Sequence, residues 1–177
     1  MGQYYKIILL ADTKHGGKEI IRMWLEPFCY RNGSKLMEHS YLGKELMNQV
    51  ESLLCVEGMF YKGRIVWAGD YADPEDGSEE NLYQLTVENG TYQAPRATST
   101  TTYRYIVNHT KKQYVDKQKC TDIHPLALLV VEGNGRGGGD YFGTNSELCG
   151  TWARHVISME HTMPEDYTEL ECNFKEE

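Results

Sequence analysis

One stretch of this 177-residue chain carries a clear helical pattern of apolar residues, and that stretch limits what the rest can form. Between Leu36 and Leu54, apolar residues recur at spacings of three and four, which predicts one long amphipathic helix over about 36–54. On this pattern, Leu46, Val50 and Leu53 face the core. A single helix must bury its apolar stripe against something else, and the other apolar segments are all short.

These short segments are typical of β-strands. The runs 4–11 and 19–25 flank a Gly-Gly turn and predict a hairpin, and 103–108 with 113–116 predict a second one. Further strand candidates are 64–71, 81–88, 126–131, 152–159 and 167–174. About seven or eight strands beside one helix indicate an α+β fold, with a mostly antiparallel sheet packed by the helix. We expect residues 1–177 to form a single globular domain.

Composition excludes several classes of function. The chain has 18 Lys and Arg against 26 Asp and Glu, a net charge of −8, which argues against binding to a nucleic-acid backbone. The apolar runs are far shorter than a membrane-spanning helix requires, so we expect no membrane partner. The five cysteines are too widely spaced for a Cys-x-x-Cys site, and we expect neither a metal nor a cofactor. Free thiols without a secretory signal favour the cytoplasm.

The most unusual segment is a glycine-rich loop. Five of the seven residues from Gly133 to Gly139 are glycine, and Arg136 lies in the middle. Consecutive backbone amides in such a loop can form an anion-binding nest, to which a guanidinium adds a forked donor. The loop lacks the following helix that a dinucleotide-binding motif requires. The pattern therefore leaves two interpretations, a loop that contacts an anionic ligand and a connector without one.

Two other groups of polar residues are candidates for a site. The strand-like segment 67–73 ends in small residues and then presents acidic and aromatic side chains that suit a sugar or ring, or that are simply solvated. Glu38, His39 and His124 lie beside apolar segments, where an imidazole could act as acid or base or could be a structural core residue. The predicted ligand-binding residues are Glu38, His39, Asp70, Tyr71, His124, Asn134, Gly135, Arg136, Gly137, Asp140 and Tyr141.

Four blocks of the sequence resemble those of a group of short proteins found in phages and some bacteria. They are MGQYYK at 1–6, GSKLMEHSY at 33–41, VWAGDYAD at 66–73, and the segment 124–141 with its HPL and EGNGRGGGDY motifs. The resemblance spans nearly the whole chain. It implies a setting, a phage-encoded protein in the host cytoplasm that acts on host metabolism or defence, and it carries over no catalytic residue.

These observations lead to one preferred function and two alternatives. We expect a cytoplasmic accessory protein that binds an anionic, nucleotide-like small molecule and sequesters a host defence signal. The first alternative is a hydrolase or transferase acting on a nucleotide-, phosphate- or ribose-containing substrate. The second is an acidic inhibitor that docks on a host protein. Whether a reaction is catalysed, and whether the chain forms a homo-oligomer, stays open at this point.

Overall fold

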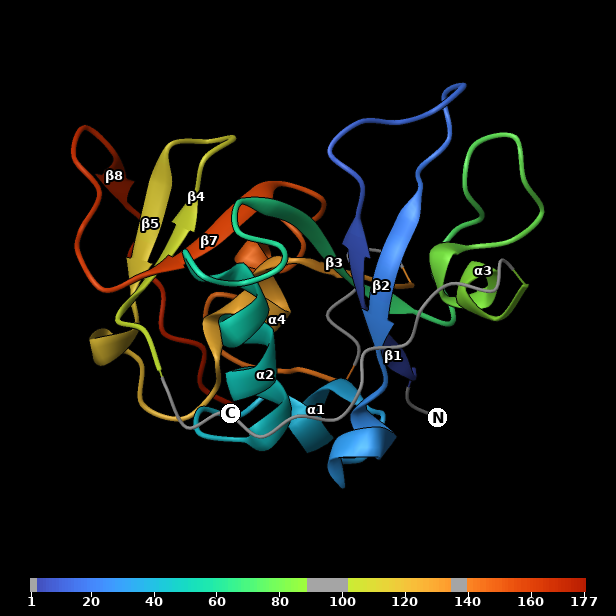
Figure 1. Cartoon of the computed structure of the whole chain (residues 1–177). Helices are drawn as coiled ribbons and strands as arrows, with labels where there is room; N and C mark the ends of the chain where they lie inside the picture. The colour runs from blue at the N-terminus through green and yellow to red at the C-terminus, as the bar shows by residue number, and fades with distance from the viewer. Residues whose placement is uncertain (1–2, 89–101, 135–139) are drawn as a thin grey trace.

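The computed structural model of the protein describes residues 3–88, 102–134 and 140–177. These residues form an α+β fold with an eight-stranded, mostly antiparallel sheet, ordered β2-β1-β3-β7-β4-β5-β8, with β6 beside β3 (Figure 1). Two strand pairs, β3 with β6 and β5 with β8, are parallel. The strands are β1 (Tyr5–Leu10), β2 (Ile21–Leu25), β3 (Gly63–Gly69), β4 (Tyr105–Asn108), β5 (Gln113–Asp116), β6 (Val131–Glu132), β7 (Val156–Glu160) and β8 (Thr168–Glu169).

The helices of the described residues are short, and the expected long helix is divided. Its two parts are separated by residues 40–44, where Leu42 donates its N–H to the Asp122 carbonyl and Gly43 adopts a φ of +83°. Backbone groups that bond to another segment cannot continue a helix, and the left-handed glycine turns the chain. The helices are α1 (Leu36–His39), α2 (Glu45–Leu54), α3 (Leu82–Glu88) and α4 (Pro125–Leu129), with 3-10 turns η1 (Pro27–Tyr30), η2 (Lys117–Lys119) and η3 (Ser146–Leu148).

Two segments expected as strands are helical. The segment 82–88 forms α3, whose first turn is capped reciprocally: Asn81 N–H donates to the Gln84 side chain and Gln84 N–H to the Asn81 side chain. Most of the run 126–131 forms α4, because Pro125 occupies its first turn and the His124 ring accepts the Leu126 N–H. Runs this short do not show whether their period is that of a helix or of a strand.

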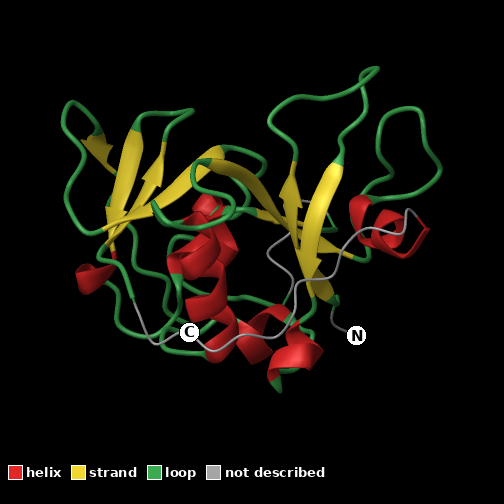
Figure 2. Ribbon diagram, in the orientation of Figure 1, coloured by secondary structure: helices red, strands yellow, loops and turns green. Residues whose placement is uncertain are grey.

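The sheet is strongly bent, and apolar clusters lie on both of its faces. Its two halves meet where β3 pairs with β7 through only two residue pairs, Gly63 with Ile157 and Arg64 with Val156. Figure 2 shows α2 and α4 in the middle of the molecule and α3 apart from them, next to the half that contains β1 and β2. The main core surrounds Trp67 and α2, whereas a second apolar cluster lies under α3 on the opposite sheet face.

A buried lysine fixes α3 to this second face. Lys6 on β1 is only 5% exposed, and its ammonium donates to the Thr86 hydroxyl at 2.9 Å. The same ammonium lies 4.8 Å from the centre of the Trp24 ring and 4.2 Å from that of Tyr83. Burial lowers the Lys6 pKa, and the two ring faces offset part of that cost by cation–π attraction. Lys6 therefore joins β1, β2 and α3.

The apolar stripe of α2 provides a test of the main core. Leu46 and Val50 are fully buried and Leu53 is 8% exposed, as the sequence pattern predicted. Leu46→Ala should lower the free energy of unfolding by about 2–5 kcal/mol, because it leaves a cavity in a packed core. Urea denaturation measures the change. Val56→Ala, at a position 68% exposed, is the control and should leave the transition unchanged; equal midpoints for both variants would contradict the packing.

Candidate functional site

The base of the glycine-rich loop is packed against the start of β1. Asn134 donates its N–H to the Gln3 side-chain oxygen at 2.9 Å. A Cβ added to Gly133 would lie 2.5 Å from that same oxygen and 3.0 Å from the Tyr5 hydroxyl, so glycine is required there by close approach. Gly135, Arg136 and Gly137 lie outside the described residues, and the predicted anion nest rests on them.

Two of the predicted site residues, Asp70 and Asp140, lie close enough to Tyr5 for their charges to act on it. Burial and then the charges of Asp140 and Asp70 raise the pKa of the Tyr5 hydroxyl. Asp140 also accepts the Met37 N–H at 3.3 Å, and Asp70 accepts the Tyr4 N–H at 2.9 Å.

Two further predicted residues, Glu38 and His39, belong to α1. Glu38 accepts the Lys35 N–H at 3.0 Å at the start of α1. The charges of Asp140 and Glu38 both act on the His39 ring, which places these three side chains in one neighbourhood. Asp140 therefore acts on both Tyr5 and His39, and the carboxylates of Glu38, Asp70 and Asp140 each accept a backbone N–H.

The two predicted histidines are buried, and both nitrogens of each ring have partners. The Trp67 indole N–H donates to His39 Nε2 at 2.9 Å, and His39 Nδ1–H donates to the Gly33 carbonyl at 2.9 Å. Burial lowers the His39 pKa to about 4. His124 bonds to the Glu51 carboxylate at 3.0 Å, in a separate cluster. Because no ring nitrogen of His39 or His124 is available to a ligand, both imidazoles have a structural role in the core.

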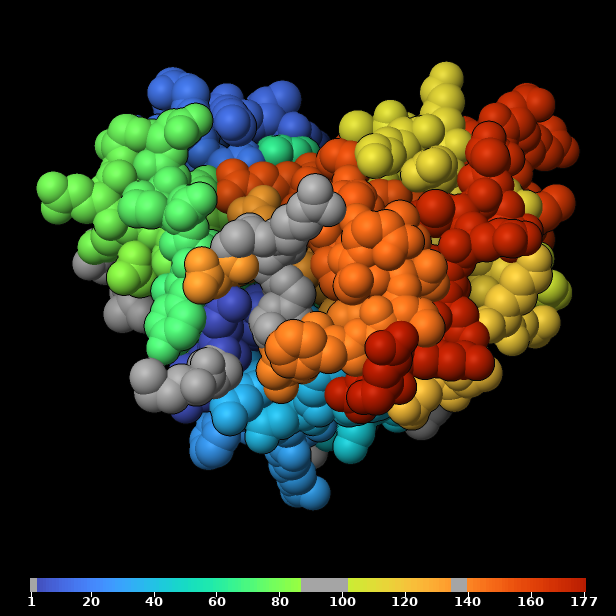
Figure 3. Space-filling model, turned by 180° about the vertical axis from the view of Figure 1, so that it is seen from behind, coloured from blue at the N-terminus to red at the C-terminus, as the bar shows by residue number. Residues whose placement is uncertain are grey.

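Tyr71 and Tyr141 lie in contrasting surroundings. Tyr71 is 49% exposed, whereas the Tyr141 ring packs edge-on against Phe174 and its hydroxyl donates to the Thr144 carbonyl. The segment after residue 139 and the C-terminal segment lie side by side on the face seen in Figure 3, joined by the Thr144 N–H to the Lys175 carbonyl. Tyr141 therefore anchors the C-terminal segment.

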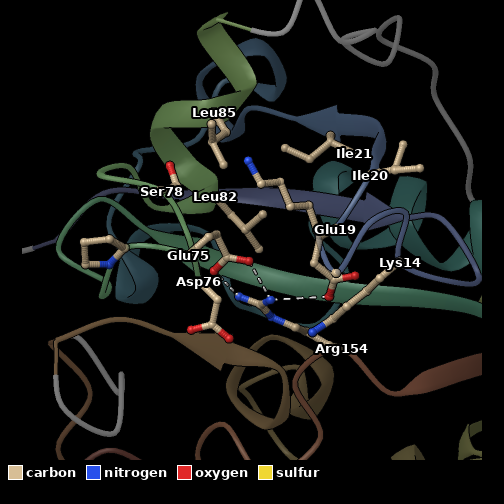
Figure 4. Close-up of a pocket in the computed structure, with 13 residues that line it drawn as sticks. Lys14, Glu19, Ile20, Ile21, Glu75, Asp76, Ser78, Leu82, Leu85 and Arg154 are labelled. Carbon is tan, nitrogen blue, oxygen red and sulfur yellow. Dashed lines mark hydrogen bonds and ion pairs between the residues drawn. The ribbon is translucent and has the colours of Figure 1, made fainter.

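A cleft of about 630 Å³ lies between α3 and the connection from β1 to β2. None of the predicted site residues that the structure describes lines this cleft. One wall of this cleft is α3, which contributes Leu82 and Leu85, and the wall facing it carries Ile20 and Ile21 (Figure 4). The connection between β1 and β2 adds Lys14, Gly17, Lys18 and Glu19. The acidic loop, residues 73–80, adds Pro74, Glu75, Asp76 and Ser78, and Arg154 precedes β7.

The floor of the cleft is formed by Glu19, Glu75 and Arg154, which belong to a network of two arginines and three glutamates. Arg154 pairs with Glu75 at 2.7 Å, with Glu132 at 2.8 Å and with Glu19 at 3.3 Å. Arg64 donates two further hydrogen bonds to the Glu19 carboxylate, of 2.9 and 2.7 Å. These side chains come from five separate segments, so the network sets the shape of the cleft.

The charges of the network stabilise one another. Burial opposes ionisation of Glu19, but the hydrogen bond from Arg64 and the charges of both arginines outweigh it and lower the Glu19 pKa. Arg154 is likewise opposed by burial, and its bonds to Glu75 and Glu132 raise its pKa. Arg154 also has a φ of +66°, which the bonded side chain and its N–H to the Ile65 carbonyl hold in place.

Sequence reasoning missed the cleft because its residues come from distant segments. Lys14 and Lys18 stand on either side of the Gly16-Gly17 turn, a local pattern that could have drawn attention to them. Arg154 is a single cation close to an apolar run, and the sequence does not indicate that it meets Glu75 across 79 positions.

Comparisons of this chain with protein-family models, with curated proteins and with solved structures find no match. Within 3–88, 102–134 and 140–177, no group of three or more His, Cys, Asp and Glu side chains is arranged to hold a metal ion. In the same residues, every helix is too short or too polar to cross a bilayer. The geometry of the cleft is therefore the basis on which a function can be assigned.

His39 should stay neutral in the folded protein well below neutral pH. Its folded pKa of about 4 lies below the ordinary value of 6.5, so between these values the unfolded chain binds a proton that the native protein excludes. Stability should therefore fall as the pH drops from about 6.5 to about 4. Imidazole ¹⁵N NMR should show an Nδ1–H tautomer at pH 5.5, with exposed His15 as the reference ring. A protonated His39 in the native state at that pH would disprove the assignment.

Glu19→Gln should weaken the network at neutral pH. The substitution leaves Arg64 and Arg154 without their shared carboxylate, and we expect a loss on the order of 3 kcal/mol in the free energy of unfolding. Because the folded pKa of Glu19 is depressed, its contribution is complete above the unfolded value of about 4.3 and is lost as the pH falls through the folded pKa. The difference from wild type should therefore shrink in acid. Glu165→Gln, at an exposed site, should show no difference at any pH.

Proposed function

We propose that the protein binds a small amphipathic anion of the nucleotide-like class in the cleft between α3 and the β1–β2 connection. The observation that carries the proposal is the combination of a volume of about 630 Å³, facing aliphatic walls and two lysines. Pockets of about 300–1,000 Å³ with apolar walls and a few polar groups are typical of small-molecule sites.

The aliphatic walls suit a flat or apolar group. Leu82 and Leu85 on α3 face Ile20 and Ile21 from the β1–β2 side (Figure 4). Ile20 is 41% exposed, so apolar surface here remains in contact with water. Covering that surface with a ring or chain would contribute about 25 cal/mol for each Å² removed from water.

The lysines provide the charge for an anionic group. Lys14 and Lys18 are exposed and line the cleft, and neither ammonium forms an ion pair with another described residue. Their positive charges lie on the same connection, separated by a tight Gly-Gly turn with φ values of +58° and +78°. Ammonium groups on flexible stems can both reach one phosphate or carboxylate.

The setting that we propose follows from the sequence resemblance. A phage-encoded protein that holds such a ligand without converting it would remove a host signal from solution. The glycine-rich loop, with Arg136 at its centre, is a proposed second contact for anions. The hydrolase or transferase alternative uses the same ligand class, so one experiment tests both.

Isothermal titration calorimetry with AMP as the probe tests the cleft. We expect Lys14→Ala/Lys18→Ala to raise Kd about ten-fold or more, a change of about 1.4 kcal/mol. Ile20→Ser should weaken binding through the apolar wall without unfolding the protein. The matched control is Lys44→Ala/Lys111→Ala, which removes two exposed lysines outside the cleft. Equal affinity of both double variants would exclude the cleft as the site.

The fate of the probe separates binding from catalysis. After prolonged incubation with Mg²⁺, the protein is denatured and the released nucleotide is analysed by mass spectrometry. Intact AMP recovered in stoichiometric amount supports sequestration. A converted product that the lysine double variant fails to make supports the enzyme alternative instead.

A further inference from the structure

Arg154 resembles an anion receptor in the cleft, but all of its donors are engaged. Its Nε donates to Glu132 at 2.8 Å, Nη1 donates to Glu19 and Glu75 at 3.3 and 2.7 Å, and Nη2 donates to Glu75 and Glu132 at 2.7 and 2.8 Å. A guanidinium has five N–H groups, and five bonds to carboxylates occupy all of them. An anionic ligand would have to displace a carboxylate to bind Arg154.

Arg64, which does not line the cleft, has four of its five N–H groups engaged. Its Nε donates to the Arg154 carbonyl at 3.1 Å, and Nη1 donates to the Ala11 carbonyl and to Glu19 at 3.0 and 2.9 Å. Nη2 donates to Glu19 at 2.7 Å. Among the cations that line the cleft, the positive charge that remains available to a ligand is therefore that of Lys14 and Lys18.

The charges of the cleft lining and of the ion-pair network to which its floor belongs sum to zero. The two arginines and three glutamates of the network sum to 2 − 3 = −1. Adding Lys14, Lys18 and Asp76 from the lining gives −1 + 2 − 1 = 0. Asp76 is exposed and forms no hydrogen bond or ion pair with another described residue, and Figure 4 shows it beside Glu75. Two lysines can match one phosphate, whereas further phosphates would meet this carboxylate and the anionic network.

We infer that the cleft selects ligands with a single anionic group, such as a nucleoside monophosphate, and disfavours di- and triphosphates. Asp76 is the residue that enforces this selection, because it is the lining carboxylate that no cation neutralises among the described residues. The inference rests on the proposed function and specifies its ligand class. It follows from charge repulsion, since like charges brought close without compensation reduce affinity.

The test compares AMP, ADP and ATP by calorimetry without Mg²⁺ at constant ionic strength. In wild type, Kd should rise along the series and be about ten-fold higher for ATP than for AMP. Asp76→Asn should lower the Kd of ATP more than that of AMP, so that the ratio falls toward one. The control is Glu79→Gln, which removes an exposed charge from the same loop outside the cleft and should leave the ratio unchanged.

Each outcome decides the inference. An ATP affinity equal to or higher than that of AMP in wild type would overturn it and leave the proposed function standing. A ratio that Glu79→Gln changes as much as Asp76→Asn would also overturn it, because net charge and not the position of Asp76 would then be responsible. No binding of any of the three nucleotides would overturn the proposed function itself.

Discussion

The guanidinium of Arg154 joins segments that are far apart in the sequence. Its carboxylate partners belong to the β1–β2 connection, the acidic loop and the end of β6, and Arg64 of β3 joins through Glu19. Such a network is favourable only when nearly every donor and acceptor has a partner, since an unpaired buried charge is costly. The five bonds of Arg154 meet that condition. The positions of the acidic loop and of the β1–β2 connection therefore depend on each other.

The second sheet face could not support a cleft without this network and the Lys6 contacts. Its apolar cluster is small, with Ile8, Leu10, Val66 and Ala68 covered by Leu82 of α3. α3 has only seven residues, too few to be stable alone. It is positioned by its reciprocal cap and by the Lys6 ammonium between two aromatic rings. One wall of the cleft thus depends on a cation–π contact and the floor on ion pairs.

The sequence predicted what local patterns encode. The buried stripe at Leu46 and Val50 and both hairpins are present, because each depends on residues a few positions apart. The division of the long helix depends on the pairing of 41–42 with 122–123, which no local pattern reports. The cleft could not be predicted for the same reason, because its lining residues come from segments far apart in the sequence. His39 and Trp67 are 28 positions apart, so the sequence could not indicate that their hydrogen bond gives the imidazole a structural role.

Arginine and lysine have different roles in this cleft, and the difference follows from the chemistry of their side chains. A planar guanidinium can bind several carboxylates at fixed angles, so Arg64 and Arg154 can hold the rigid, partly buried network to which the floor belongs. An ammonium is compact and strongly hydrated, which favours the exposed rim where Lys14 and Lys18 lie. The charges needed to build the site are thereby separated from those able to meet a ligand. Counting cations in the sequence would overstate the anion-binding capacity of the cleft, because it is the engaged hydrogen-bond donors that decide it.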